Sequence, residues 1–105
     1  MNNNALGNLQ QLTLLAVARL GDDAFGGAIR DELQQVAQRK VTISTVYVTL
    51  VRLENQGLVK STRDEAPGSR GGKAKRFFRL TPESWEALEV SRGALSRMWQ
   101  GVKPA

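Results

Sequence analysis

Apolar residues recur every three or four positions along three early segments of the chain, which is the spacing of one face of an α-helix. The first two segments are residues 9–20 and 24–37, and Gly21 follows the first as a helix stop. The third, residues 43–56, is rich in β-branched side chains, which favour strands. Its apolar stripe nevertheless keeps the helical period: Ile43, Val46, Tyr47, Leu50 and Leu53. Because this period outweighs the propensity, the pattern predicts three successive helices.

Residues at the ends of these segments predict where the helices begin and end. We expect Asp22 or Asp23 to cap the second helix and Thr42 the third, since their side-chain oxygens accept hydrogen bonds from the first free N–H groups. Gly57 is expected to end the third helix. The β-branched residues around Val41 could add one short strand before it.

Two strand-like segments follow, residues 58–63 and 75–80, joined by the loop DEAPGSRGGKA, whose proline and three glycines permit tight turns. We expect Phe77 and Leu80, or their neighbours, to anchor this basic hairpin (residues 58–80) on the core. The run Thr81-Pro82-Glu83 then opens a fourth helix, which extends to about Gly101, because proline suits the first helical position and a carboxylate its positive end.

The predicted order is helix, helix, helix, strand, basic loop, strand, helix. This is a mainly α, α+β arrangement with the layout of a winged helix-turn-helix. We expect the winged helix-turn-helix to span residues 1–81 and a C-terminal dimerisation helix to span residues 82–105, both in one compact unit.

Composition excludes several functions for this 105-residue chain, whose length predicts one domain. It has no cysteine and no histidine, so it lacks the usual nucleophiles, acid-base groups and transition-metal ligands. The carboxylate pairs Asp22-Asp23 and Asp64-Glu65 fall at expected turns with no apolar pocket around them. We therefore expect no enzyme activity, no cofactor and no metal. Without a signal-like or membrane-spanning apolar run, the expected location is cytoplasmic.

Positive charge is concentrated in one segment. Residues 60–79 hold seven basic and two acidic residues, a net charge of +5, whereas the rest of the chain holds eight of each sign. Such a segment suits a polyanion, because Coulomb attraction and counterion release act where phosphates lie. The alternative is a solvated loop kept for solubility.

The third helix offers an outward face that could enter the major groove of double-stranded DNA. With its apolar stripe inward, its outer residues are Ser44, Thr45, Val48, Thr49 and Arg52. Of these, Arg52 alone could form a bidentate contact to guanine, and the Tyr47 hydroxyl could reach a phosphate. The hairpin candidates for phosphate contact are Arg70, Lys73, Lys75 and Arg76. Alone, the helix would suit an ordinary Ser/Thr-rich surface better; the adjacent basic hairpin favours DNA.

The last helix carries more apolar surface than one small domain can easily cover. Its large apolar residues are Trp85, Leu88, Leu95, Met98, Trp99 and Val102. We expect it to pack on a second copy of the chain, and the resulting two-fold homodimer would place two recognition helices on a palindromic site. The alternative is that Trp85 and Trp99 close the monomer's own core.

These motifs resemble the PadR family of bacterial winged-helix transcription regulators. The resemblance covers residues 6–100 and rests on LLAVARLGDDAFGGAIRDEL (14–33), VTISTVYVTLVRLENQGLVKS (41–61) and, most specifically, RGGKAKRFFRLT (70–81). It implies a homodimeric repressor whose C-terminal helix forms much of the dimer interface. The chain departs from the family pattern in Phe25, Phe77 and Phe78, where tyrosines are common.

The resemblance also implies, for many members, release from DNA by a phenolic compound, a drug or another small hydrophobic molecule. The single C-terminal helix is similar to that of a smaller subgroup, some of which hold flat aromatic compounds between interface tryptophans. Aligning the RLTP start places that tryptophan nearer Leu95 than Trp99. The candidate effector-binding residues are Leu12, Leu15, Leu95, Met98 and Trp99.

Two other classes of function stay open. The chain could be a small-molecule or drug-binding sensor whose pocket matters more than DNA. It could also be a winged helix used for protein or RNA contacts.

Overall fold

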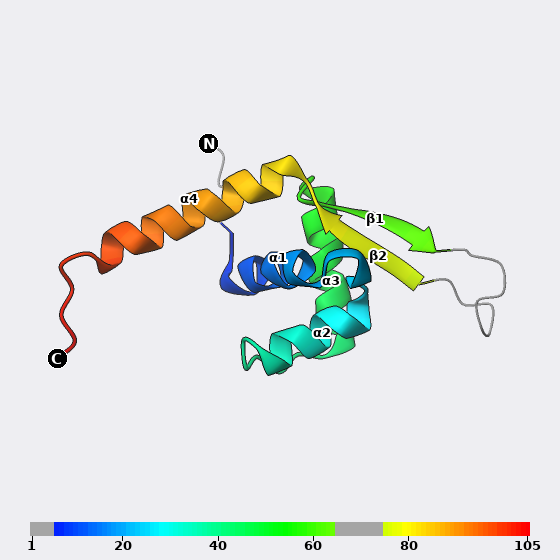
Figure 1. The fold of residues 1–105 in the computed structure, drawn as a ribbon, viewed down its shortest axis with the longest axis horizontal. Coiled ribbons are helices and arrows are strands. Elements are labelled where there is room, and N and C mark those ends of the chain that lie inside the picture. The colour runs from blue at the N-terminus through cyan, green and yellow to red at the C-terminus, as the bar shows by residue number, and fades with distance from the viewer. Residues whose placement is uncertain (1–5, 65–74) are drawn as a thin grey trace.

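The computed structural model describes residues 6–64 and 75–105, and these residues form four α-helices and one antiparallel hairpin (Figure 1). The elements are α1 (Asn8–Leu20), the short 3₁₀ turn η1 (Gly21–Asp23), α2 (Gly26–Gln35), α3 (Ile43–Asn55), β1 (Val59–Asp64), β2 (Lys75–Leu80) and α4 (Pro82–Trp99). The predicted order of elements is confirmed, and so is the mixed α+β class.

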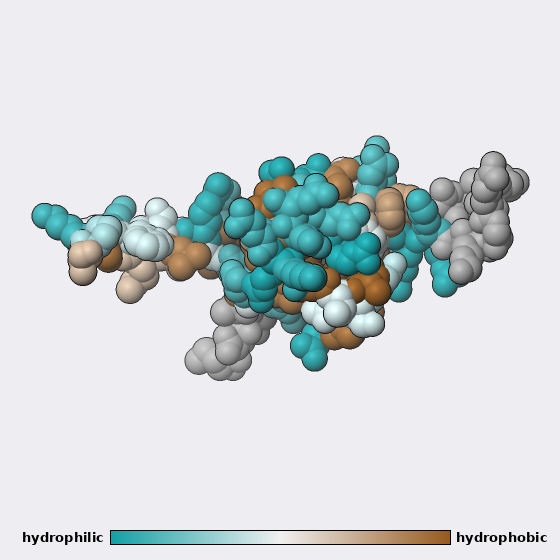
Figure 2. All heavy atoms as spheres, turned by 90° about the horizontal axis from the view of Figure 1, so that it is seen from below, coloured by the Kyte–Doolittle hydropathy of each residue, from teal (hydrophilic) through white to brown (hydrophobic). Residues whose placement is uncertain are grey.

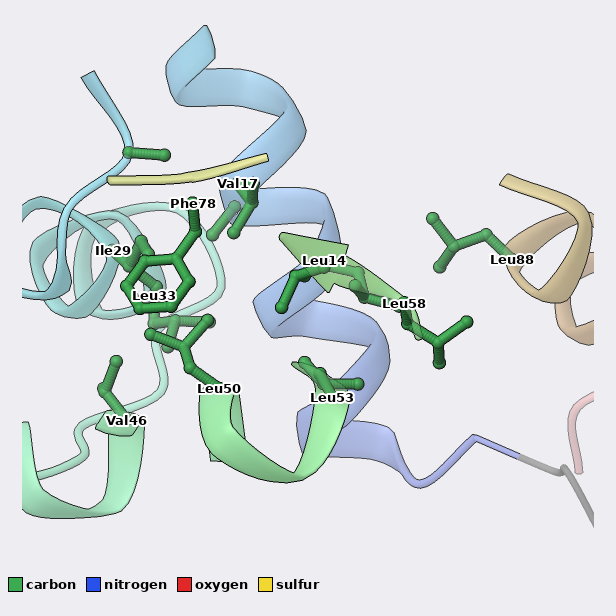
Figure 3. Close-up of a cluster of buried hydrophobic side chains, with 13 residues drawn as sticks. Leu14, Val17, Ile29, Leu33, Val46, Leu50, Leu53, Leu58, Phe78 and Leu88 are labelled. Carbon is green, nitrogen blue, oxygen red and sulfur yellow. The ribbon is translucent and has the colours of Figure 1, made fainter. Parts of the chain in front are cut away.

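The core lies where α1, α2 and α3 meet and the hairpin closes over them (Figure 3). Its largest fully buried apolar side chains come from the three helices and β1: Leu14, Val17, Ile29, Leu33, Val46, Leu50, Leu53 and Val59. Phe78 from β2 and Leu88 from α4 complete it. Burial of these apolar surfaces is the main term that holds α3 at a fixed angle to the hairpin.

Both predicted ends of α3 are confirmed. The Thr42 hydroxyl accepts a hydrogen bond from the Thr45 N–H at 3.1 Å. At the other end Gly57 has a φ of 76°, a left-handed conformation that favours glycine. Its N–H donates to the Glu54 carbonyl at 3.0 Å, and the Leu58 N–H donates to the Leu53 carbonyl at 2.9 Å. This Schellman motif turns the chain from α3 directly into β1.

The start of α2 differs from the prediction. Asp22 and Asp23 belong to η1, and α2 begins at Gly26 after Phe25, whose side chain makes no capping bond. The cause is pairing with β2: the Phe78 N–H donates to the Ala24 carbonyl at 2.9 Å, and Phe25 forms a β-bridge with Phe77. This pairing keeps the chain extended until Phe25. In the described residues no strand forms around Val41.

The hairpin register decides which side chains face the helices. Val59, Ser61 and Arg63 pair with Leu80, Phe78 and Arg76 on one face. Phe78 is therefore the buried anchor together with Leu80, which packs on the core. Phe77 and Leu80 cannot share a face, because successive side chains alternate along a strand. Phe77 instead lies on the other face, where its ring meets that of Phe25 edge-on at 5.8 Å.

The fourth helix is fixed to the body only at its beginning. The Thr81 hydroxyl accepts from the Ser84 N–H at 3.3 Å and donates to the Gly57 carbonyl at 2.7 Å, and Leu88 is buried. Beyond Leu88, α4 projects away from the other helices, and it ends at Trp99 rather than Gly101 (Figure 1). Across the described ranges, no helix is both long and apolar enough for a membrane span.

Candidate nucleic-acid interface

The outer face of α3 keeps four of its five predicted members. Ser44, Thr45, Val48 and Arg52 are exposed. The prediction for Thr49 is wrong: its side chain is only 7% exposed, and its hydroxyl donates to the Thr45 carbonyl at 2.8 Å. A threonine can be buried at little cost when its own helix satisfies the hydroxyl in this way. Thr49 therefore belongs to the edge of the core and not to the outer face.

Tyr47 lies at the edge of α3 that faces the hairpin. Its ring stands edge-on to that of Phe78 at 6.5 Å and covers Gly26 in the first turn of α2. A Cβ on Gly26 would approach the Tyr47 hydroxyl to 2.5 Å, so this contact requires glycine at position 26. Tyr47 remains 37% exposed. Its ring packs, as the apolar stripe predicts, while part of the residue stays open to solvent.

A closed set of polar contacts ties the hairpin to α3. Nη2 of Arg76 lies 2.6 Å from a carboxylate oxygen of Glu54, and Nε of Arg76 donates to the Ser61 hydroxyl at 3.0 Å. The Ser61 hydroxyl donates to the other carboxylate oxygen of Glu54 at 2.8 Å. We call Glu54, Ser61 and Arg76 the latch. Because Glu54 neutralises Arg76, that candidate for phosphate contact has a structural partner within the chain.

Two further cations of the hairpin, Lys75 and Arg63, are exposed. Lys75 is exposed, with its ammonium 4.1 Å from the centroid of the Phe25 ring. Arg63 is exposed opposite Arg76, on the hairpin face that also carries Ser61. Arg63 belongs to the basic segment of the sequence but was missed as a site residue, although strand alternation places it on the face toward α3. Arg70 and Lys73 lie outside the described residues.

The outer face of α3 and the hairpin stem (β1 and β2) adjoin each other. Tyr47 and Glu54, which contact the hairpin, lie on one edge of α3. At 3.6 residues per turn, Val51 and Ser44 come next around the helix, followed by Val48. Arg52 forms no ion pair with any residue the structure describes. The polar face of α3 therefore adjoins the hairpin face that carries Arg63, and one duplex could contact both. Lys75 lies on the other face of the hairpin, with Phe77.

The candidate effector residues lie in two separate places. Leu12 and Leu15 line an open apolar groove between α1 and α2 of about 450 Å³, together with Leu33 and Val36. The ion pair between Arg19 and Glu32 closes part of its rim. The α4 candidates stand on the projecting arm, seen at left in Figure 2: Leu95, Met98 and Trp99, which are 56%, 75% and 67% exposed. One copy of the chain does not bring the two groups together.

The exposure of the two tryptophans also decides an open alternative. Trp85 is 52% exposed and Trp99 is 67% exposed. The possibility that both close the monomer's own core is therefore wrong.

Three helices with an exposed polar face on the third, followed by a cationic hairpin, define a winged helix-turn-helix protein. The chain belongs to the PadR-like family of transcriptional regulators, whose family model matches residues 14–90. Members of this family are transcription regulators rather than enzymes, which confirms that expectation, and membership implies DNA binding.

Solved structures show the same fold. A PadR family transcription regulator from Clostridium difficile is 22% identical with a TM-score of 0.71, over 88% of this chain and 91% of that one. A PadR family transcriptional regulator from Eggerthella lenta is 26% identical with a TM-score of 0.69, over 89% and 80% of the two chains. A PadR-like regulator from Bacillus cereus is 18% identical with a TM-score of 0.66, over 90% and 93%. No curated protein sequence matches the chain.

Proposed function

We propose that this PadR-like regulator binds palindromic operator DNA as a homodimer and represses transcription. One observation carries the proposal: the exposed face of α3 adjoins the cationic hairpin stem, joined to it by the latch. In this proposal Ser44, Thr45, Val48 and Arg52 face base edges, and the Tyr47 hydroxyl reaches a phosphate. Lys75, Arg70 and Lys73 meet the backbone from the hairpin. The proposal includes a cytoplasmic location.

The proposed dimer rests on the apolar stripe of α4. Leu95, Met98, Trp99 and Val102 are all more than half exposed in one chain. Contiguous exposed apolar surface of this kind is typical of an interface with another molecule. We propose that a second copy covers it, because a two-fold dimer would set two α3 helices about one turn of DNA apart, as a palindrome requires.

The proposed effector is a small, flat hydrophobic molecule that releases the protein from DNA. The α1–α2 groove offers apolar residues such as Leu12 and Leu15, and α4 offers Leu95, Met98 and Trp99. The proposal requires the second copy to bring the two groups together. Quenching of tryptophan fluorescence by planar aromatic compounds would support it, while a broad panel without quenching would contradict it. Should quenching occur without any DNA binding, the sensor function would be favoured instead.

Footprinting on the protein's own promoter tests DNA binding directly. We expect a protected palindrome, and a reporter under that promoter should be more active when the protein is absent. The triple variant Arg70→Ala, Lys73→Ala, Lys75→Ala should bind all sequences more weakly, because fewer phosphates are neutralised. Its salt slope should fall by about one unit for each phosphate that the variant no longer touches.

A matched control removes three charges from the C-terminal region: Arg92→Ala, Arg97→Ala and Lys103→Ala. Both variants lose the same net charge, so the comparison separates hairpin contacts from the overall field. Equal salt slopes in the two variants would show that the hairpin does not contact the duplex. An unprotected promoter, together with no enriched sequence after selection from random DNA, would contradict the proposed function.

A further inference from the structure

Two valines form an apolar ridge on the outside of α3. Val48 is 52% exposed and Val51 is 44% exposed. At 3.6 residues per turn, Val48 lies almost opposite the buried side chains Val46 and Leu50, so it is the outermost point of the helix. The apolar stripe in the sequence places Val48 on the outside but does not identify Val51 as a surface residue.

Folding alone does not explain valines at these positions. Valine has a lower helix propensity than alanine, lysine or glutamate, because its branched side chain is restricted in a helix. Val48 and Val51 are each about half exposed, so the chain itself covers only part of each side chain. Single exposed apolar side chains are common on protein surfaces, but two neighbouring ones on the outer face of one helix form a small apolar patch that another molecule could cover.

The surroundings of the ridge indicate what covers it. Ser44 and Arg52 lie on the same outer face, and the exposed Arg63 lies beyond the adjoining edge, on the hairpin face that carries Ser61 and Arg76. Apart from the partly exposed ring of Tyr47 beside Val51, the side chains that flank the ridge are polar, so a protein partner or the chain's own second copy would find little apolar surface there. A surface with a narrow apolar line inside a polar, cationic frame matches the floor of a DNA major groove, where thymine methyl groups are the apolar feature.

We propose that Val48 and Val51 read thymine methyl groups, so that each operator half-site requires thymines under α3. This inference rests on the proposed function and gives the base specificity of the same site. Residues three apart on a helix have side chains about 5–6 Å apart. Successive base pairs are ~3.4 Å apart along DNA. The two valines can therefore contact thymines at neighbouring or next-neighbouring positions.

The test uses deoxyuridine, which differs from thymidine only by the missing methyl group. The operator is first obtained by selecting bound sites from random DNA. Each thymine in a half-site is then replaced singly by deoxyuridine, and binding of the full-length protein is measured. We expect one or two positions per half-site at which affinity falls about fourfold, the effect of one buried methyl group.

Protein variants assign those positions to the ridge. In Val48→Ala, one sensitive position should lose its response to deoxyuridine, and in Val51→Ala the other should, because the methyl then has no partner. Both variants should fold, since alanine is the better helix former and both sites are exposed. Val90→Ala, which removes an exposed valine from α4, should leave the pattern unchanged.

The outcomes separate the inference from the proposed function. Selection that yields no bound DNA would contradict the proposed function itself. Specific binding with no response to deoxyuridine would overturn the proposed reading of thymine by the two valines but not the proposed function. A response that persists in the double variant Val48→Ala, Val51→Ala would do the same. Loss of the response in both single variants, but not in Val90→Ala, would support the ridge.

Discussion

The helices α3 and α4 are both amphipathic, but the rest of the chain covers their apolar faces to different extents. Of its 13 residues, α3 buries Val46, Thr49, Leu50 and Leu53. Of its 18 residues, α4 buries only Ser84 and Leu88. The chain buries the apolar inner face of α3 by itself, and the outer face, which is polar apart from two valines, stays exposed. On α4 the apolar stripe continues beyond the body with nothing from the described chain to cover it. The difference fits the proposal that α3 presents its outer face to DNA while α4 packs on a second copy of the chain.

The largest expected effect on the free energy of unfolding comes from truncating a buried leucine of α3, and an exposed leucine of α4 provides the comparison. Leu50 is fully buried, so Leu50→Ala should reduce the free energy of unfolding by about 2–5 kcal/mol. Leu95 is exposed, so Leu95→Ala should change unfolding only at protein concentrations where a dimer forms. Urea unfolding followed by circular dichroism, at two protein concentrations, measures both. Equal, concentration-independent losses in the two variants would contradict the distinction between the helices.

A second expected effect concerns the apolar stripe of α4. Trp99→Ala should weaken self-association by ~2–4 kcal/mol, because buried tryptophans dominate the energy of many interfaces. Val90 is also exposed on α4 but lies off the stripe, so Val90→Ala serves as the matched control. Sedimentation velocity over a range of concentrations measures the dissociation constants. If the wild-type protein sediments as a monomer at micromolar concentration, the proposal of a homodimer is wrong.

The parts of the fold that were predictable have a local cause. A sustained helical period, the Thr42 cap and Gly57 place α3 to within one residue, because each acts through neighbours in the sequence. The segment Thr81-Pro82-Glu83 locates the start of α4 for the same reason. Strand alternation likewise contains the information that Phe78, and not Phe77, shares a face with Leu80.

The parts that were missed depend on contacts between distant segments. The start of α2 is set by pairing of Ala24 and Phe25 with β2, which lies more than fifty residues later in the chain. Thr49 is a local exception: its hydroxyl donates to the carbonyl four residues earlier, which lets the side chain be buried, so its polarity was a poor guide to exposure. The latch joins Glu54 of α3 to Arg76 of β2, and no local sequence pattern predicts this contact. Of the candidate interface, the exposed helix face was predictable and its connection to the hairpin was not.

A third effect tests whether the face of α3 reads bases. Arg52→Ala should cost about 1–3 kcal/mol of binding free energy, selectively at one base pair, if its guanidinium bonds a guanine. The reason is that a bidentate contact discriminates one base, while affinity for other sequences changes little. Binding to the selected operator and to single-base variants of it measures the effect. Arg92→Ala on α4 is the matched control, and a uniform loss across all sequences would show that Arg52 contacts only phosphate.

The smallest expected effect separates two neighbouring cations of β2. Lys75 is exposed over the Phe25 ring, whereas Arg76 is neutralised by Glu54 within the latch. Lys75→Ala should lower the salt slope of DNA binding by about one unit.

Arg76→Ala should leave that slope unchanged and instead reduce the free energy of unfolding by up to about 1 kcal/mol, the usual range for an ion pair with both partners partly exposed. Glu54→Gln should reproduce the loss of stability, because it removes the same charge pair from the other side. Titrations at several salt concentrations, together with urea unfolding, distinguish the two roles. A lower slope in Arg76→Ala would mean that DNA displaces Glu54 and takes Arg76 as a phosphate contact. The latch would then open on binding, and the rigid connection between α3 and the hairpin would hold only in the free protein.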